Sequence, residues 1–180
     1  MQLKPFLFLT SLTTVVLSSS IPDIVRDLGI IATYAGELNT AISSVVLVPG
    51  FGTMLSIHSS AVSAVTMLNA TAADAQTVAT PVSVDDGNLV LNAVNGMKST
   101  VESALTAVVA KKTSFGSFFA VIPGAAALNP VRQDLIALNT STVLLGNILV
   151  SIAPPQLQAQ SSATLTELTS AFATAISAYS

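Results

Sequence analysis

The sequence contains no cysteine and no tryptophan, and charged residues make up only 8% of its 180 residues. Without cysteine the chain can form no disulfide, so its stability has to come from side-chain packing. The single histidine, His58, and the scattered acidic residues have no spacing that would hold a metal ion. We therefore expect neither a metal site nor a cofactor.

Residues that could perform catalysis are equally scarce. The chain has no Gly-x-Ser-x-Gly motif, and the serines beside His58, Ser56 and Ser59, would point away from it on a helix. Basic residues are also few: Lys111-Lys112 is the only adjacent pair, at a position where positive charge complements the end of a helix. The sequence therefore predicts no enzyme, no catalytic residues and no binding of nucleic acid.

The N-terminus has the three-part layout of a secretory signal peptide. Lys4 precedes an apolar run over residues 6–17, which is followed by small residues and Pro22. We expect a signal peptide at residues 1–20, cleaved after Ser18 or Ser20, and a single helical domain over residues 21–180. Loss of Lys4 would leave five basic residues against nine acidic ones, a net charge of about −4. The prediction is a secreted protein, either extracellular or held in a cell wall.

Beyond the leader, apolar residues recur at alternating spacings of three and four, which predicts helices that each bury one stripe. The stripes cover residues 24–45, 54–79, 90–108, 131–152 and 165–179. Proline-containing turns separate most of them, and Thr53, Ser83 and Asn129 are the expected N-caps. The predicted fold is all-α, an up-and-down bundle of about five long helices.

Small residues on these stripes, such as Ala35, Ala61, Ala72 and Ala75, leave space between helices and favour a central apolar cavity. Such a cavity can hold an acyl chain without any catalytic group. Pro49-Gly50 and the faces rich in serine and threonine leave no uninterrupted apolar span of about 20 residues after the leader. We therefore do not expect an integral membrane protein.

Residues 111–128 hold three of the seven phenylalanines, and Gly116, Pro123 and Gly124 predict an irregular loop there. This aromatic loop has three interpretations: a lid over an open end of the bundle, an exposed adsorbing patch, or an ordinary plug of the core. His58 is either a packed imidazole or a contact for a ligand head group. The predicted lipid or surface contacts are Phe51, Met54, Met97, Phe115, Phe118, Phe119 and Ile122.

Two N-glycosylation sequons begin at Asn69 and Asn139. Both fall within predicted helices, whereas an acceptor usually lies in an accessible loop.

Several short motifs together resemble the fungal hydrophobic surface-binding protein A family, also described as cell-wall galactomannoproteins. They are Arg26-Asp27, Ile57-His58-Ser59, residues 109–112 followed by Phe115, Asp134-Leu135 and the C-terminal residues 171–179. The resemblance implies an all-helical cell-wall or extracellular protein that adsorbs to hydrophobic surfaces or binds fatty acids inside its bundle. It further implies a lipid or hydrophobic solid surface as partner, and a secreted esterase as a candidate protein partner. The alternative is a structural cell-wall mannoprotein without a small-molecule ligand.

Overall fold

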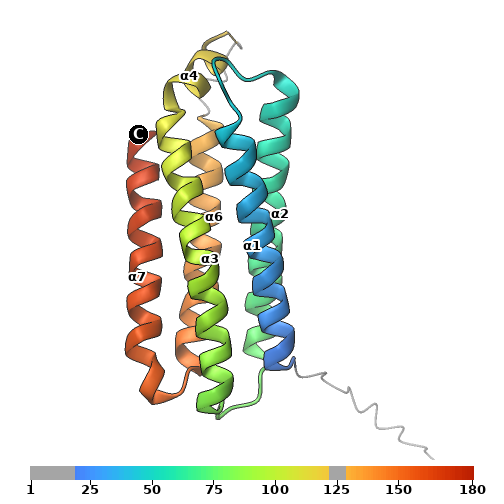
Figure 1. The fold of residues 1–180 in the computed structure, drawn as a ribbon, viewed down its shortest axis with the longest axis vertical. Coiled ribbons are helices and arrows are strands. Elements are labelled where there is room, and N and C mark those ends of the chain that lie inside the picture. The colour runs from blue at the N-terminus through green and yellow to red at the C-terminus, as the bar shows by residue number, and fades with distance from the viewer. Residues whose placement is uncertain (1–18, 122–128) are drawn as a thin grey trace, which may run out of the picture.

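The computed structural model describes residues 19–121 and 129–180, and within them it contains six helices and no strand (Figure 1). The helices are α1 (Ile21–Ser43), α2 (Phe51–Gln76), α3 (Val84–Ala110), α4 (Lys112–Ala120), α6 (Pro130–Ile152) and α7 (Pro155–Ala178). The predicted all-α bundle of long helices is confirmed, with the short α4 as an addition.

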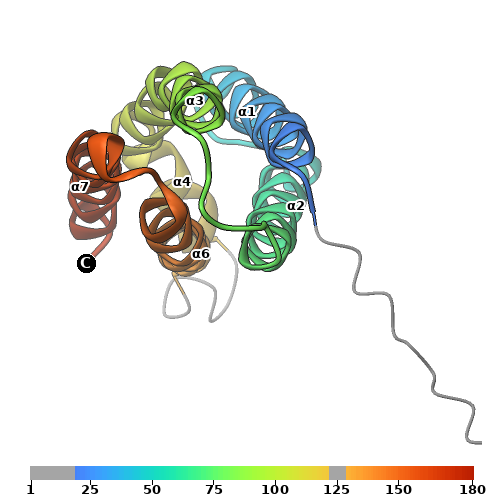
Figure 2. The same ribbon diagram turned by 90° about the horizontal axis from the view of Figure 1, so that it is seen from below.

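The five long helices pack as a closed ring. Around the ring α1 contacts α2, α2 contacts α6, α6 contacts α7, α7 contacts α3, and α3 contacts α1 again. In the view along the bundle these helices surround a common centre, and α4 lies across the end that is uppermost in Figure 1 (Figure 2). The interior of such a ring has to be filled by side chains, so small residues on the inner stripes leave space there.

The predicted caps Ser83 and Asn129 are confirmed, and Ser20 is a further cap that was not predicted. Ser20 caps α1 in a reciprocal box with Asp23, and the side chains of Ser83 and Asn129 accept hydrogen bonds from the backbone N–H of Asp86 and Arg132. The prediction of Thr53 as a cap is wrong. Gly50 has the extended backbone of an N-cap, and α2 begins directly after it at Phe51.

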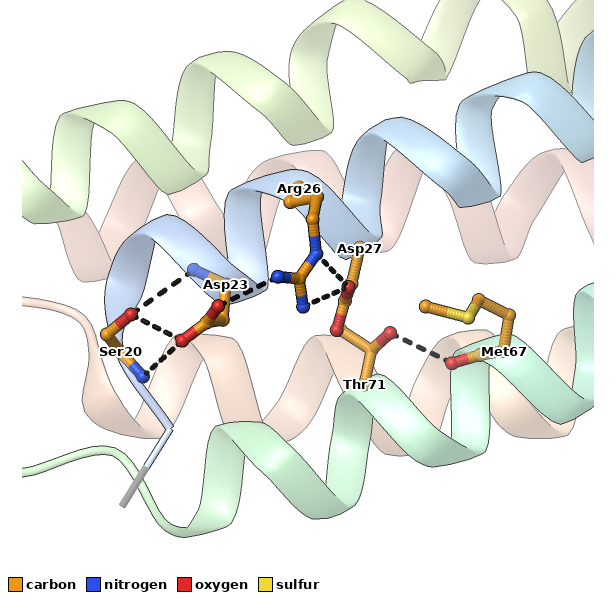
Figure 3. A network of polar contacts seen from close by, with 6 residues as sticks. All are labelled: Ser20, Asp23, Arg26, Asp27, Met67 and Thr71. Carbon is orange, nitrogen blue, oxygen red and sulfur yellow. Dashed lines mark hydrogen bonds and ion pairs between the residues drawn. The ribbon is translucent and has the colours of Figure 1, made fainter. Parts of the chain in front are cut away.

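Arg26-Asp27 is part of a polar network at the lower end of the bundle (Figure 3). Arg26 donates to Asp27 Oδ1 from Nε at 3.1 Å and to Asp23 Oδ1 from Nη1 at 2.9 Å. Asp27 is buried, and its side chain points toward Thr71 of α2, whose hydroxyl donates to the Met67 carbonyl at 2.9 Å. This motif therefore lies where α1 faces α2, far from the end that α4 covers.

The aromatic segment is not the loop that was predicted. Residues 112–120 form α4, because Phe115, Phe118 and Phe119 have the i, i+3, i+4 spacing of a helical stripe. Gly116 within this stretch costs only about 1 kcal/mol relative to alanine, which packing of the aromatic side chains offsets. Phe115 and Phe118 are buried, Phe119 is half-buried, and Ile122 lies outside the described residues.

Two of the helices, α2 and α6, are long and apolar enough to cross a membrane by length and composition alone. The expectation that the chain has no such span after its leader was wrong on this point. In the bundle both helices pack against neighbours in the ring, α2 against α1 and α6 against α7. Core helices of soluble bundles have the same length and hydropathy. This property therefore does not distinguish a membrane-spanning helix from a helix in a bundle core.

Candidate lipid-binding site

A cavity of about 310 Å³ lies within the upper half of the ring, beneath α4. Its volume falls at the lower end of the range of about 300–1,000 Å³ that is typical of small-molecule sites. Side chains from α1, α2, α3, α4 and α6 line it, and nearly all of them are apolar. Two hollows lower in the bundle have only about 60 Å³ each, room for a few water molecules.

Most of the residues predicted to contact lipid meet at this cavity. The ones that line it are Phe51, Met54, His58, Phe115, Phe118 and Phe119. Met97 does not line this cavity: it borders the two small hollows instead. Its place near the middle of α3 puts it below the level of the cavity, and its contact with lipid stays a prediction.

The upper wall of the cavity is aromatic. Phe115 is 1% exposed and Phe118 is 8% exposed, so both belong to the core rather than to a surface patch. The rings of Phe118 and Phe119 meet edge to face, with centroids 5.3 Å apart at an interplanar angle of 75°. Phe119 also borders a second hollow of about 260 Å³, on the side of Lys112. Phe119 therefore separates the cavity from a hollow that opens near a lysine.

Small side chains create the space. Ala61 of α2 and Ala104 of α3 are both buried and both line the cavity, where larger residues would fill it. Ala61 was among the small stripe residues singled out from the sequence, whereas Ala104 and Asp134 were missed. The remaining apolar lining comes from stripe positions of the surrounding helices, including Leu38, Ile42, Leu105, Val108, Leu135 and Leu138.

One polar pair stands at the wall of this apolar site. His58 Nδ1 lies 2.9 and 3.0 Å from the two carboxylate oxygens of Asp134 on α6. An ionised carboxylate only accepts, so the Nδ1–H group of His58 donates a hydrogen bond to Asp134. Desolvation in the wall raises the pKa of Asp134, and the hydrogen bond from His58 opposes that rise. The side chain of His58 is 55% exposed, which leaves it accessible from the surface.

The two sequons differ in accessibility. Asn69 is exposed on α2, although Thr71 of the same sequon is fully buried. Asn139 is half-buried on α6, and its side-chain oxygen is enclosed without a hydrogen-bond partner among the described residues. Of the two acceptor side chains, that of Asn69 is the more exposed.

Within the described residues, no three side chains of His, Cys, Asp or Glu are grouped in a way that could hold a metal ion. The lining of the cavity offers burial of apolar matter beside one histidine–aspartate pair.

The sequence profile of the family "Hydrophobic surface binding protein A" matches residues 21–151. The chain belongs to this family. The resemblance inferred from short motifs is thereby confirmed, as is the expectation of a binding protein rather than an enzyme. No protein with a curated description matches the chain in sequence.

Solved structures with the same fold hold fatty acids. The structure of Afmp4p in complex with palmitic acid aligns with a TM-score of 0.79 and 26% identity, covering 89% of this chain and 99% of Afmp4p. Two ligand-binding domains of the Penicillium marneffei MP1 protein, both complexed with arachidonic acids, align more distantly. Domain 1 has a TM-score of 0.74 and 15% identity, covering 86% of this chain and 95% of the domain. Domain 2 has a TM-score of 0.73 and 12% identity, covering 88% of this chain and 93% of the domain. At these identities the two domains support the fold alone.

Proposed function

We propose that this member of the hydrophobic surface binding protein A family is a secreted fatty-acid-binding protein whose ligand occupies the cavity beneath α4. The observation that supports this most directly is the cavity itself, about 310 Å³ with an almost wholly apolar lining and one polar pair. A relative that is 26% identical, Afmp4p, was crystallised with palmitic acid. A structural mannoprotein without a ligand would have no use for such a space, because unfilled volume weakens a core.

The acyl chain would supply most of the affinity. Burial of each methylene contributes about 0.8 kcal/mol, so a chain of a dozen carbons or more needs no strong polar contact to bind tightly. The walls contribute shape and exclude water, and the polar pair at the wall sets which end of the ligand faces outward.

Displacement of a fluorescent fatty acid by unlabelled palmitate tests this function. We expect saturable binding of the probe at about one molecule per chain, and competition by palmitate but not by a short-chain acid such as butyrate, which buries too few methylenes. Probe fluorescence that is unchanged by the protein, or equal competition by both acids, would argue for the structural alternative.

We further propose that His58 acts as an imidazolium, in which Nε2 donates to the carboxylate of the ligand while Asp134 accepts from Nδ1 and orients the ring. Replacing both residues, as His58→Ala/Asp134→Ala, avoids leaving the half-buried carboxylate unpaired. We expect the affinity for palmitate to fall about fivefold, the size of one partly exposed hydrogen bond to a charged group. The affinity for methyl palmitate should stay within about twofold, since this ester has no charge to lose. The same displacement assay measures both, and an equal loss for acid and ester would remove His58 from the head-group role.

The capping of α1 favours one of the two predicted cleavage sites. Ser20 caps the helix, and the Ser19 backbone N–H donates to Thr77 Oγ1 at 2.9 Å, so cleavage after Ser20 would remove both contacts. We propose that the signal peptide is residues 1–18 and that the mature chain begins at Ser19. N-terminal sequencing of the secreted protein should find Ser19 first, and a start at Ile21 would show that the cap is dispensable.

Two further proposals concern a glycan and a protein partner. A glycan, where one is attached, fits at Asn69 rather than at Asn139. A secreted esterase partner is implied by the family resemblance alone, and co-purification of an esterase with the protein from culture medium would be its first test.

A further inference from the structure

We propose that the upper end of the bundle docks on an anionic lipid layer through an apolar tip, defined as Val46, Leu47 and Val48 of the α1–α2 connection. Docking would bring the mouth of the cavity against the layer, and the idea that ligand then passes between them rests on the proposed fatty-acid-binding function. Four observations support the docking itself. The side chains of the tip are exposed, its base is fixed to the bundle, basic residues lie at the same end, and the tip adjoins residues that line the cavity.

The tip exposes three consecutive large apolar side chains. Val46 is 83% exposed, Leu47 is 79% exposed and Val48 is 57% exposed. Phe51, at the start of α2 directly beyond the tip, is 70% exposed. Single exposed apolar residues are common, but a continuous group on one projecting connection marks a contact surface for apolar matter.

The base of the tip is fixed to the bundle. Val45 and Pro49, which flank the tip, are both buried. The Lys111 ammonium at the end of α3 donates to the Val45 carbonyl at 2.5 Å, which ties the connection to the neighbouring helix. The buried neighbours therefore fix the connection so that the side chains of the tip point outward and cannot fold back onto the core.

The charged side chains are distributed unequally between the two ends of the bundle. Lys111 and Lys112 stand where α3 meets α4, and Arg132 lies in the first turn of α6 at the same end, where the acidic side chain is Asp134. Acidic residues outnumber basic ones at the opposite end, where Asp23 and Asp27 pair with Arg26 and where Asp85 and Asp86 lie in the first turn of α3. Glu37 and Glu102 lie further down the sides, in the interiors of α1 and α3.

An apolar tip beside basic side chains fits an anionic lipid layer, because each lysine or arginine near such a surface strengthens binding about fivefold. The acidic opposite end would be repelled, so the molecule would dock with one orientation. A second copy of the chain is the less suitable occupant, since a symmetric contact through this end would bring the basic side chains of both copies together.

The tip is also continuous with the cavity. Phe51 and Leu55 are exposed and line the cavity at the same time. With the tip inserted, these two side chains would form an apolar path from the lipid layer into the cavity. An acyl chain could then enter without crossing water, which removes the largest cost of transferring it.

Vesicle flotation tests the docking. The probes are phosphatidylcholine vesicles and vesicles of equal parts phosphatidylcholine and phosphatidylserine. Wild-type protein should partition onto the anionic vesicles at least about fivefold more strongly than onto the neutral ones, and salt should reduce the difference. The variant Lys112→Gln should partition onto anionic vesicles about fivefold more weakly than the wild type. Its partition onto neutral vesicles should be unchanged.

The tip variant Val46→Ser/Leu47→Ser/Val48→Ser should partition onto both kinds of vesicle at least about tenfold more weakly than the wild type, because three apolar side chains no longer insert. A matched control, Val62→Ser/Leu89→Ser, removes exposed apolar side chains from the sides of α2 and α3 and should behave as wild type. All substituted side chains are exposed, so thermal melting should be nearly unchanged, which shows that the variants are folded.

Equal losses in the tip variant and in the control would overturn the proposal, as would a wild-type protein that floats with neither kind of vesicle. A wild-type dimer that the tip variant converts to monomer in sedimentation would also overturn it, in favour of self-association. Fatty-acid displacement in vesicle-free buffer separates the two claims. The tip variant should bind fatty acid normally, and protein that docks without binding fatty acid would contradict the proposed function alone.

Discussion

Replacing Ala61 with phenylalanine is expected to weaken fatty-acid binding about 100-fold while the bundle stays folded. Ala61 is 3% exposed and its side chain faces the cavity from α2, so a benzyl group at this position would project into the space that an acyl chain would fill. If that group excludes about four methylenes at about 0.8 kcal/mol each, the cost is about 3 kcal/mol, or somewhat more than 100-fold in Kd. The fold should tolerate the change because the new side chain enters existing volume rather than a filled core.

The measurement is displacement of a fluorescent fatty acid, with thermal melting of the same samples. Ala70→Phe is the matched control, since Ala70 lies on the exposed side of the same helix. The control should bind as wild type does. Unchanged binding by Ala61→Phe with an unchanged melting temperature would mean that the acyl chain binds elsewhere, and the cavity would lose its assigned role.

Phe115→Ala is expected to lower the free energy of unfolding by about 3–5 kcal/mol, the usual cost of removing a fully buried aromatic side chain. Phe115 is 1% exposed and packs with the upper core, where it fixes α4 across the end of the ring. Its loss should both enlarge the cavity and loosen α4, so the affinity for fatty acid should change as well.

Chemical denaturation followed by circular dichroism measures this loss. Phe51→Ala serves as the comparison, because Phe51 is 70% exposed and its removal should change the free energy of unfolding by no more than about 0.5 kcal/mol. A cost below about 1 kcal/mol for Phe115→Ala would show that α4 contributes little to the fold. The aromatic segment would then be a replaceable cover rather than part of the core.

The bundle could be predicted from the sequence because its long helices each bury a stripe with regular spacing. Residues such as Ile24, Leu28 and Ile31 recur at the helical period and all lie in the core. Capping residues placed the starts of α3 and α6 correctly for the same reason, since a cap is a local interaction between residues three positions apart. The start of α2 was misplaced because Gly50 caps through its backbone conformation, which leaves no side-chain signal.

The aromatic segment was misjudged because glycine and proline signals were given more weight than periodicity. Phe115, Phe118 and Phe119 have helical spacing, and this signal could have identified α4. The site was predicted in part: the aromatic residues and His58 were found by composition and position. Asp134 was not, because it lies 76 residues from His58 and only the packing of α2 beside α6 brings the two together.

The spacing of the helices around the ring explains why the sequence indicated a cavity but could not establish it. Ala61 and Ala104 are ordinary helix-forming residues in the sequence, and nothing local shows that their side chains line the same cavity. Whether small residues yield close packing or empty space depends on how far apart the helices stand. That distance is set by all five long helices together with α4.

A crystal structure of the protein with a fatty acid brominated at its methyl end would test the central claim most directly. The anomalous signal of bromine locates the end of the acyl chain without reliance on weak density. We expect the bromine inside the ring beneath α4, among Phe115, Ala61 and Ala104, with the carboxylate toward His58. Bromine found only on the outer surface of the bundle, with the cavity empty, would contradict the account.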